Sequence, residues 1–187
     1  MIILTVFMIV GACLLRLVPH IPNVAPVSAM ALFGGVYLDR KWSLLVPLFA
    51  MIISDYLLLY VHPYSSPMVS FDRVYPISAL FHSTTIYVWG SFAISGLIGL
   101  WLRKRNIASN VILASLFSSV QFFIITNFGV WASGMYSRDI SGLVESYVMG
   151  IPFFRWTLYG DIFYTLVFFG SYALAMRMTS AKKLAAM

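Results

Sequence analysis

Six apolar stretches, separated by polar or charged passages, constrain this chain more than any other feature of its sequence. Roughly 20 apolar residues in an α-helix cross the hydrocarbon core of a membrane. Only 10% of the residues are charged, against about a quarter in a soluble domain, and the mean hydropathy is +0.90. We therefore predict an all-α integral membrane protein, with a single transmembrane domain over residues 1–187. The six transmembrane helices are predicted at residues 1–18, 25–38, 43–60, 77–102, 107–131 and 153–176.

The second predicted helix is rich in small residues. Ala25 and Ala29 form one pair of small residues spaced four apart, and Ala31 and Gly35 form another. Such pairs let another membrane helix approach closely. Two interpretations stay open here: these residues dock on an external partner, or they pack against other helices of the same chain.

Basic residues are distributed unequally between the two sides of the predicted bundle. With six crossings, one side holds eight of them: Arg40, Lys41, Arg103, Lys104, Arg105, Arg177, Lys182 and Lys183. The other side holds four: Arg16, Arg73, Arg138 and Arg155. The positive-inside rule predicts that the more basic side, and with it both termini, lies in the cytoplasm. The polar stretches 16–24, 61–76 and 132–152 are then outside.

The net charge of +6 does not predict binding to nucleic acid, because no basic run is interleaved with exposed aromatic residues. Signatures of enzymes are also missing, among them a His-Glu-x-x-His helix, a Gly-x-Ser-x-Gly elbow and a phosphate-binding glycine loop. The three histidines are not spaced four apart, which makes a haem or a metal cluster unexpected. The lone Cys13 excludes an internal disulfide. Neither catalysis nor a cofactor is therefore predicted.

A polar passage between the last two predicted helices contains a short amphipathic helix, predicted over residues 139–150. Apolar side chains recur there at helical spacing, Asp139 can cap the start, and Gly150 followed by Pro152 is expected to end the helix. Such a segment is either an interfacial strap on the lipid headgroups or a lid over a cavity.

Seven residues are candidates for binding a ligand. An ionised carboxylate within a membrane helix costs at least ~3 kcal/mol, so Asp55 and Asp161 should each face a partner or a wet cavity. The alternative for each is a structural hydrogen bond to a neighbouring helix. His82, Thr85 and Trp89 form a polar and aromatic stripe on the fourth predicted helix, although a lone histidine also serves as a contact between helices. Two further residues lie near the outer ends of their helices: Asn127 and Tyr164. The predicted pocket lies between the fourth, fifth and sixth helices, beneath residues 139–150.

Four segments resemble a group of bacterial membrane proteins to which no substrate is assigned: Arg16–Asn23, Ala29–Gly35, Thr126–Trp131 and Ile151–Asp161. That group is similar in size and layout to S components, the substrate-binding subunits of energy-coupling-factor vitamin transporters. The resemblance implies an S-component-like bundle in the bacterial inner membrane. It also implies an outward-facing pocket for a small vitamin or related nutrient.

The resemblance further implies a docking element on a transmembrane coupling subunit, with energy supplied by separate ATPases. Ala25 and Ala29 have the spacing of that element, and Ala31 with Gly35 is the second choice because Pro26 interrupts the first pair. Among vitamins cobalamin is the first candidate, with His82 as a ligand to its cobalt. The alternative function is a non-transporting accessory subunit of a larger membrane complex, followed by a membrane enzyme.

Overall fold

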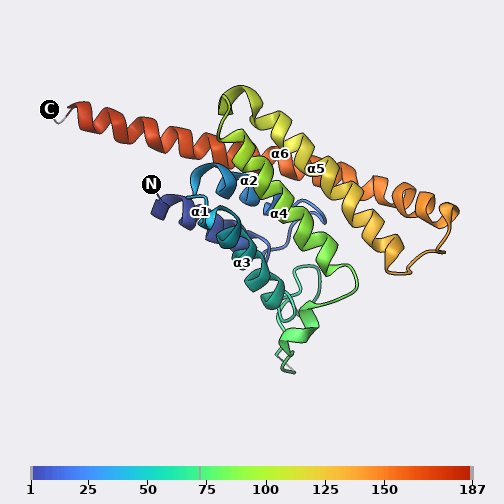
Figure 1. The fold of residues 1–187 in the computed structure, drawn as a ribbon. Helices are drawn as coiled ribbons and strands as arrows, with labels where there is room; N and C mark the ends of the chain where they lie inside the picture. Colours follow the sequence, from blue (N-terminus) through green and yellow to red (C-terminus); the bar gives the residue numbers. More distant parts are fainter. Residues whose placement is uncertain (1, 72, 186–187) are drawn as a thin grey trace.

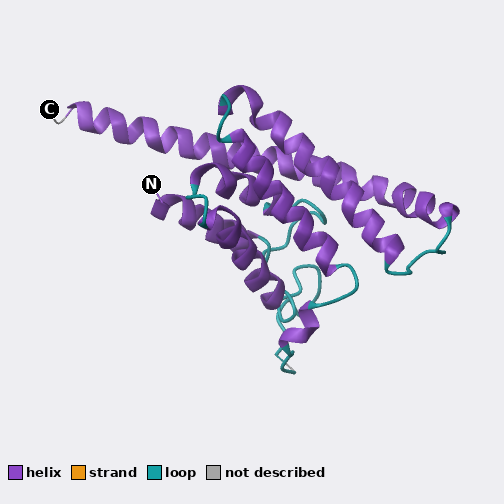
Figure 2. Ribbon diagram, viewed as in Figure 1, coloured by secondary structure: helices purple, strands orange, loops and turns teal. Residues whose placement is uncertain are grey.

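The apolar stretches form helices connected by loops in a computed structural model, which describes residues 2–71 and 73–185 (Figures 1 and 2). The ends of the predicted domain, residues 1 and 186–187, lie outside the described residues. Within the described part no strand occurs, only an isolated bridge between Val61 and Val69. The prediction of an all-α protein is confirmed. The elements are α1 Ile2–Leu15, α2 Val27–Tyr37, α3 Trp42–Leu57, a short 3-10 helix η1 Ile77–Leu80, α4 Thr85–Leu102, α5 Ile107–Ala132 and α6 Ile140–Ala185.

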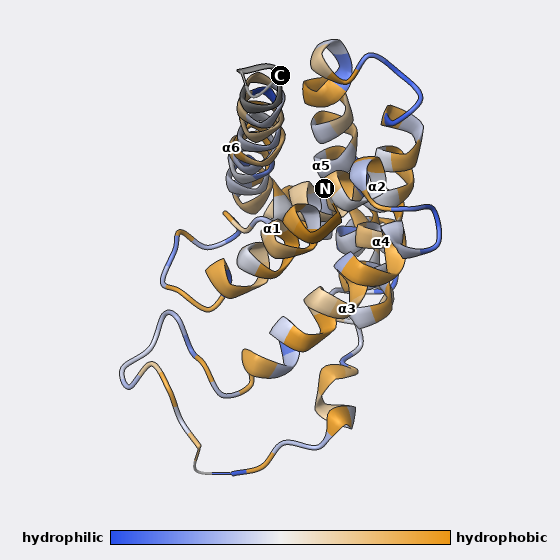
Figure 3. Cartoon of the chain, turned by 90° about the vertical axis from the view of Figure 1, so that its left-hand side faces the viewer, coloured by the Kyte–Doolittle hydropathy of each residue, from blue (hydrophilic) through white to orange (hydrophobic). Residues whose placement is uncertain are grey.

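Three helices are long and apolar enough to cross a membrane by length and composition: α4, α5 and residues 140–181 of α6. Helices α1, α2 and α3 are apolar but have only 14, 11 and 16 residues. Apolar residues are abundant along the helices, whereas polar stretches concentrate in the connections (Figure 3). Large apolar side chains on the helix surfaces are exposed, as expected for a protein surrounded by lipid; Ile3 and Ile86, for example, are 85% and 76% exposed.

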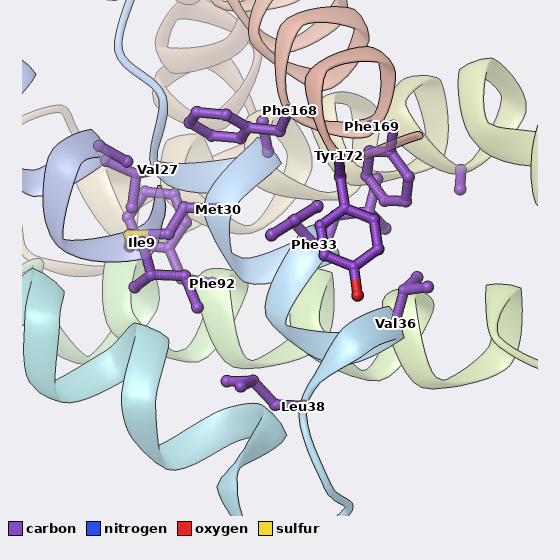
Figure 4. Close-up of a cluster of buried hydrophobic side chains, with 14 of the residues drawn as sticks. Ile9, Val27, Met30, Phe33, Val36, Leu38, Phe92, Phe168, Phe169 and Tyr172 are labelled. Atoms are coloured by element: carbon purple, nitrogen blue, oxygen red, sulfur yellow. The ribbon is translucent and has the colours of Figure 1, made fainter. Parts of the chain in front are cut away.

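Helix α2 is the centre of the molecule. All its residues from Val27 to Val36 are buried, and it packs against α1, α3, α4, α5 and α6. Phe33 is fully buried and its ring contacts Phe168, Phe169 and Tyr172 of α6, with ring centroids 5.3 to 5.9 Å apart (Figure 4). An apolar helix of this length that is enclosed by protein is typical of a buried core helix.

The small residues of α2 are used inside the chain. A Cβ atom on Gly35 would collide with the Gly96 carbonyl oxygen and lie 2.7 Å from the Cα of Gly99, so glycine is required where α2 meets α4. Ala29 and Ala31 are also buried, with 1% and 2% exposed. The prediction that these three α2 residues dock on an external partner is therefore wrong, because helices of the same chain already cover them.

The carboxyl end of α2 is fixed by Arg103, at the end of α4. Its guanidinium group donates to the Gly35 carbonyl oxygen, from Nη2 at 2.6 Å, and also to the Leu38 carbonyl oxygen. The last carbonyls of a helix have no partner within the helix, and a cation there also interacts favourably with the helix dipole. Arg103 thus anchors α4 to the core helix.

Helix α6 corrects the prediction of a separate amphipathic helix. Residues 140–150 are its first turns, and α6 continues through Pro152 for 46 residues in all. Gly150 does not end the helix: a Cβ atom there would lie 2.8 Å from the Asn127 Cγ, so this glycine permits close contact with α5. The segment packs along α5, where the Ser146 hydroxyl donates to the Asn127 carbonyl oxygen at 2.6 Å, and none of its residues lines the cavity that contains Asp161.

Candidate functional site

A cavity of about 460 Å³, called the main cavity below, lies at the end of the bundle where α1 and α3 finish and α2 and α4 begin. Its apolar wall includes Val88 and Phe92 of α4 and Phe122 of α5. Its polar lining comes from α6 and α2 and from the two loops that follow α1 and α3: Arg16, His20, Asn23, Ser28, His62 and Asp161.

Asp161, on α6, lines the main cavity and is only 2% exposed. Its Oδ2 atom accepts a hydrogen bond from the Ser119 hydroxyl of α5 at 2.7 Å, and the Ser28 hydroxyl of α2 also hydrogen-bonds to the carboxylate. The adjacent Gly160 lets the loop before α2 lie directly against α6, since a Cβ atom there would be 2.9 Å from the Val24 Cα. Among the described residues, no basic side chain forms an ion pair with Asp161.

Arg16, at the end of α1, lines the same cavity but is already paired. Its Nη2 lies 2.7 Å from Oδ1 of Asp55 on α3, and its Nη1 donates to the Ser54 hydroxyl. The other carboxylate oxygen of Asp55 accepts the indole N–H of Trp89 at 3.0 Å. Asp55, predicted to bind a ligand, is therefore the partner that holds Arg16 at the cavity wall. The Asp55 side chain is 23% exposed and the Arg16 side chain 15%.

Two loops meet over the main cavity through His20 and Tyr64. The Tyr64 hydroxyl lies 3.1 Å from Nε2 of His20, and Nδ1 of His20 lies 2.7 Å from the Val18 carbonyl oxygen. Because a carbonyl only accepts, Nδ1 donates to Val18, and in the neutral imidazole Nε2 then accepts from Tyr64. Partial burial raises the pKa of Tyr64 and the Arg16 charge opposes that shift, so the hydroxyl remains a donor at neutral pH.

The loop that carries Tyr64 is held in place by the end of α3. The Tyr56 hydroxyl donates to the Tyr75 carbonyl oxygen at 3.0 Å, and the Tyr75 amide donates to the Tyr60 hydroxyl at 3.0 Å. The His62 amide donates across the loop to the Met68 carbonyl oxygen at 2.6 Å. These contacts position His62 and Tyr64 at the cavity.

The sequence-predicted residues on α5 and α6 lie in three different places. Asp161 lines the main cavity, whereas Asn127 lines an adjoining cavity of about 130 Å³ that shares Asn23 and Thr157 with it. The Asn127 amide nitrogen donates to the Phe123 carbonyl oxygen at 2.8 Å. Tyr164 packs against the hydrophobic core and lines neither cavity.

The predicted stripe on α4 does not reach the main cavity. His82, Thr85 and Trp89 line a separate apolar groove of about 470 Å³, where α4 faces α3. Thr85 is further occupied in the turn before α4, since its hydroxyl donates to the Leu80 carbonyl oxygen at 2.8 Å. The prediction of one pocket shared by this stripe and Asp161 is wrong, because the stripe occupies a different face of α4. His82 is therefore also not placed to bind cobalt in the main cavity.

Sequence reasoning missed most of the polar lining of the main cavity. Arg16, His20 and Asn23 lie in one motif that carried the family resemblance, but a proline-containing loop has no periodicity from which to predict a common orientation. His62 was visible only as a histidine followed by proline in a polar loop. Ala25, predicted to dock on a partner, instead lines the cavity.

Comparison with protein-family models gives a match that covers nearly the whole chain. The model described as a family of unknown function (DUF6580) matches residues 1–184. Among curated proteins and solved structures, none matches the chain.

Proposed function

The chain belongs to this family of unknown function, and we propose that it is a substrate-binding membrane subunit for uptake of a small vitamin or related nutrient. The observation that carries the proposal is the main cavity. Its volume of about 460 Å³ falls within the roughly 300–1,000 Å³ typical of small-molecule sites. Apolar walls with a few convergent polar groups are also the usual composition of such sites.

In this proposal the chain crosses the bacterial inner membrane six times in an S-component-like bundle, with both termini in the cytoplasm. The beginning of α1 and the end of α6 lie toward the same end of the molecule, which supports an even number of crossings (Figure 1). The main cavity is at the opposite end, and there it would face the exterior. Helix α2 does not have to match the bilayer thickness, because protein surrounds it.

The size and placement of the main cavity favour a ligand smaller than cobalamin. The volume lies in the lower half of the usual range, and His82 lines a different groove. Energy would come from separate ATPases or the protein would act alone. A coupling subunit would have to dock on a surface other than Ala29 and Gly35, which are buried.

The first experiment is to purify the protein in lipid nanodiscs and identify retained small molecules by mass spectrometry. Binding of the identified molecule is then compared in two tryptophan variants of α6. Thr157→Trp fills the main cavity, whereas Tyr159→Trp changes a side chain that is 63% exposed and does not line it. We expect at least a tenfold loss of affinity for the first variant and none for the second. Failure to find any ligand, or equal binding by both variants, would contradict the proposal.

A further inference from the structure

Among the described residues, Asp161, the acid that lines the main cavity, has no counter-ion. Asp161 has 2% of its surface exposed and receives hydrogen bonds from two serine hydroxyls. Arg16 is the cavity's arginine, and its guanidinium group is paired with Asp55 and hydrogen-bonded to Ser54. In the part of the chain that the structure describes, Arg16 and Asp55 form the one ion pair.

The two imidazoles of the cavity do not supply the missing charge either. His20 is engaged on both ring nitrogens, one with the Val18 carbonyl oxygen and the other with Tyr64. His62 also lines the cavity, but the described residues include no ion pair between a histidine and Asp161.

A buried carboxylate without a cation is costly. Removing an ionised group from water costs several kcal/mol, and two neutral hydroxyl donors offset only part of this. A cation brought by a ligand would offset the rest, and the bond between them would be a charge-assisted hydrogen bond. Since Asp161 lines a cavity that is open to a ligand, the structure provides the space for such a cation beside the acid.

We infer that the ligand of the main cavity carries a protonated amine that binds Asp161, and an apolar or aromatic body that packs on Phe92 and Phe122. These two rings form one apolar surface in the cavity wall, with centroids 5.0 Å apart. The inference deepens the proposed function and rests on it, because it assigns a substrate class to the same site. Thr157, one turn before Asp161 on α6, supplies a further polar contact at the same wall.

The test uses three indole probes of similar size on the full-length protein in nanodiscs at neutral pH. Tryptamine carries a protonated amine, tryptophol a neutral hydroxyl and indole-3-acetate a carboxylate. We expect tryptamine to bind at least tenfold more tightly than the other two by calorimetry. Asp161→Asn should abolish that preference. Glu145→Gln, which removes an exposed carboxylate from the same helix, should preserve it.

Comparison of the three probes on the unaltered protein requires no variant, so poor folding of Asp161→Asn leaves the test intact. Equal binding of tryptamine and tryptophol would overturn the inference, and so would a preference that survives in Asp161→Asn. Equal binding of the two probes would mean that Asp161 is a protonated acid that only forms hydrogen bonds. A retained neutral or anionic ligand would likewise overturn the amine assignment but leave the proposed function standing. Absence of any retained or bound small molecule would overturn both.

Discussion

Asp55 and Asp161 are the same residue type in similarly apolar stretches of the sequence, yet their neighbours in the structure differ. Asp55 has a cation at 2.7 Å and an indole donor at 3.0 Å, so its charge is compensated within the protein. Asp161 accepts hydrogen bonds from hydroxyl groups and lines the main cavity. Asp55 therefore holds Arg16 at the cavity wall, whereas in the proposed function Asp161 binds the ligand.

The pairing around Asp55 gives the first prediction. Asp55→Asn leaves the Arg16 charge without a partner and should lower the free energy of unfolding by ~2–3 kcal/mol, measured by chemical unfolding in detergent micelles. Trp89→Phe removes only the donated N–H and should cost less, about 1–2 kcal/mol. Adding Arg16→Gln to Asp55→Asn removes both charges and should recover part of the loss. A double variant whose loss of stability equals or exceeds the sum of the losses of Asp55→Asn and Arg16→Gln measured alone would show that the pair is not the source.

How far these residues could be predicted depends on what determines each position. An acid within an apolar run requires a partner or a cavity, so Asp55 and Asp161 were identifiable from the sequence alone. Whether an acid has a partner or a cavity depends on distant residues. Arg16 lies 39 positions from Asp55, and Ser119 lies 42 positions from Asp161. No local pattern encodes such distant pairings.

At the scale of single elements, the apolar stretches located the helices well, but composition misjudged some of their ends and faces. Gly150 and Pro152 have the composition of a helix stop, but contact with α5 maintains α6 through both. From the sequence alone, the small residues of α2 fit an external docking face as well as they fit internal packing. Only the position of α4 against Gly35 shows that the face is internal.

The start of α6 carries a pH-dependent prediction. The Gly142 amide and the Ser137 hydroxyl donate to Oδ1 of Asp139, at 2.7 and 2.9 Å, and these bonds hold the pKa of Asp139 below its ordinary value. A depressed folded-state pKa means that the cap stabilises α6 fully above about pH 4, the unfolded pKa, and loses its effect as pH falls through the folded pKa. Hydrogen exchange in the first turn, corrected for intrinsic rates, should therefore increase at low pH.

Asp139→Ala should raise hydrogen exchange in that turn already at neutral pH and remove the pH response. Glu145→Ala, which removes an exposed carboxylate further along α6, is the matched control and should leave both unchanged. An unaltered first turn in Asp139→Ala would show that packing on α5, and not the cap, fixes the start of α6.

The contact between α2 and α4 gives a prediction with a control on the same pair of helices. Gly35→Ala places a Cβ atom against the Gly96 and Gly99 backbone, which cannot move aside as a side chain could, and should destabilise the protein by about 1–3 kcal/mol or more. Gly90→Ala on α4 meets nothing within 4 Å and should stabilise by about 0.5–1 kcal/mol. Thermal unfolding measures both. Normal stability of Gly35→Ala with loss of uptake alone would restore the docking prediction.

At the scale of the whole molecule, the positions of the basic residues and the length of α6 both bear on how the protein would sit in a membrane. The basic cluster from Arg103 to Arg105 lies between α4 and α5, toward the end where α1 begins and α6 finishes (Figure 1). Lys182 and Lys183, also counted on that side, lie outside the side chains that the structure describes. Helix α6, at about 1.5 Å per residue, is about 69 Å long, more than twice a hydrocarbon core of about 30 Å. In the proposed membrane orientation α6 would therefore extend beyond the bilayer or lie strongly tilted in it.

The last prediction tests which end of the molecule faces outward. In a Cys13→Ala background, Val74→Cys and Met135→Cys introduce thiols at positions that are 88% and 63% exposed, at the cavity end. Ala108→Cys introduces one in the first turn of α5, at the opposite end, without changing a charge or the Asn106 cap. On intact cells, an impermeant maleimide should label the first two and not the third, whereas all three should react after lysis. Because the eight-to-four asymmetry of basic residues determines this orientation, labelling of Ala108→Cys alone on intact cells would reverse it and turn the main cavity toward the cytoplasm.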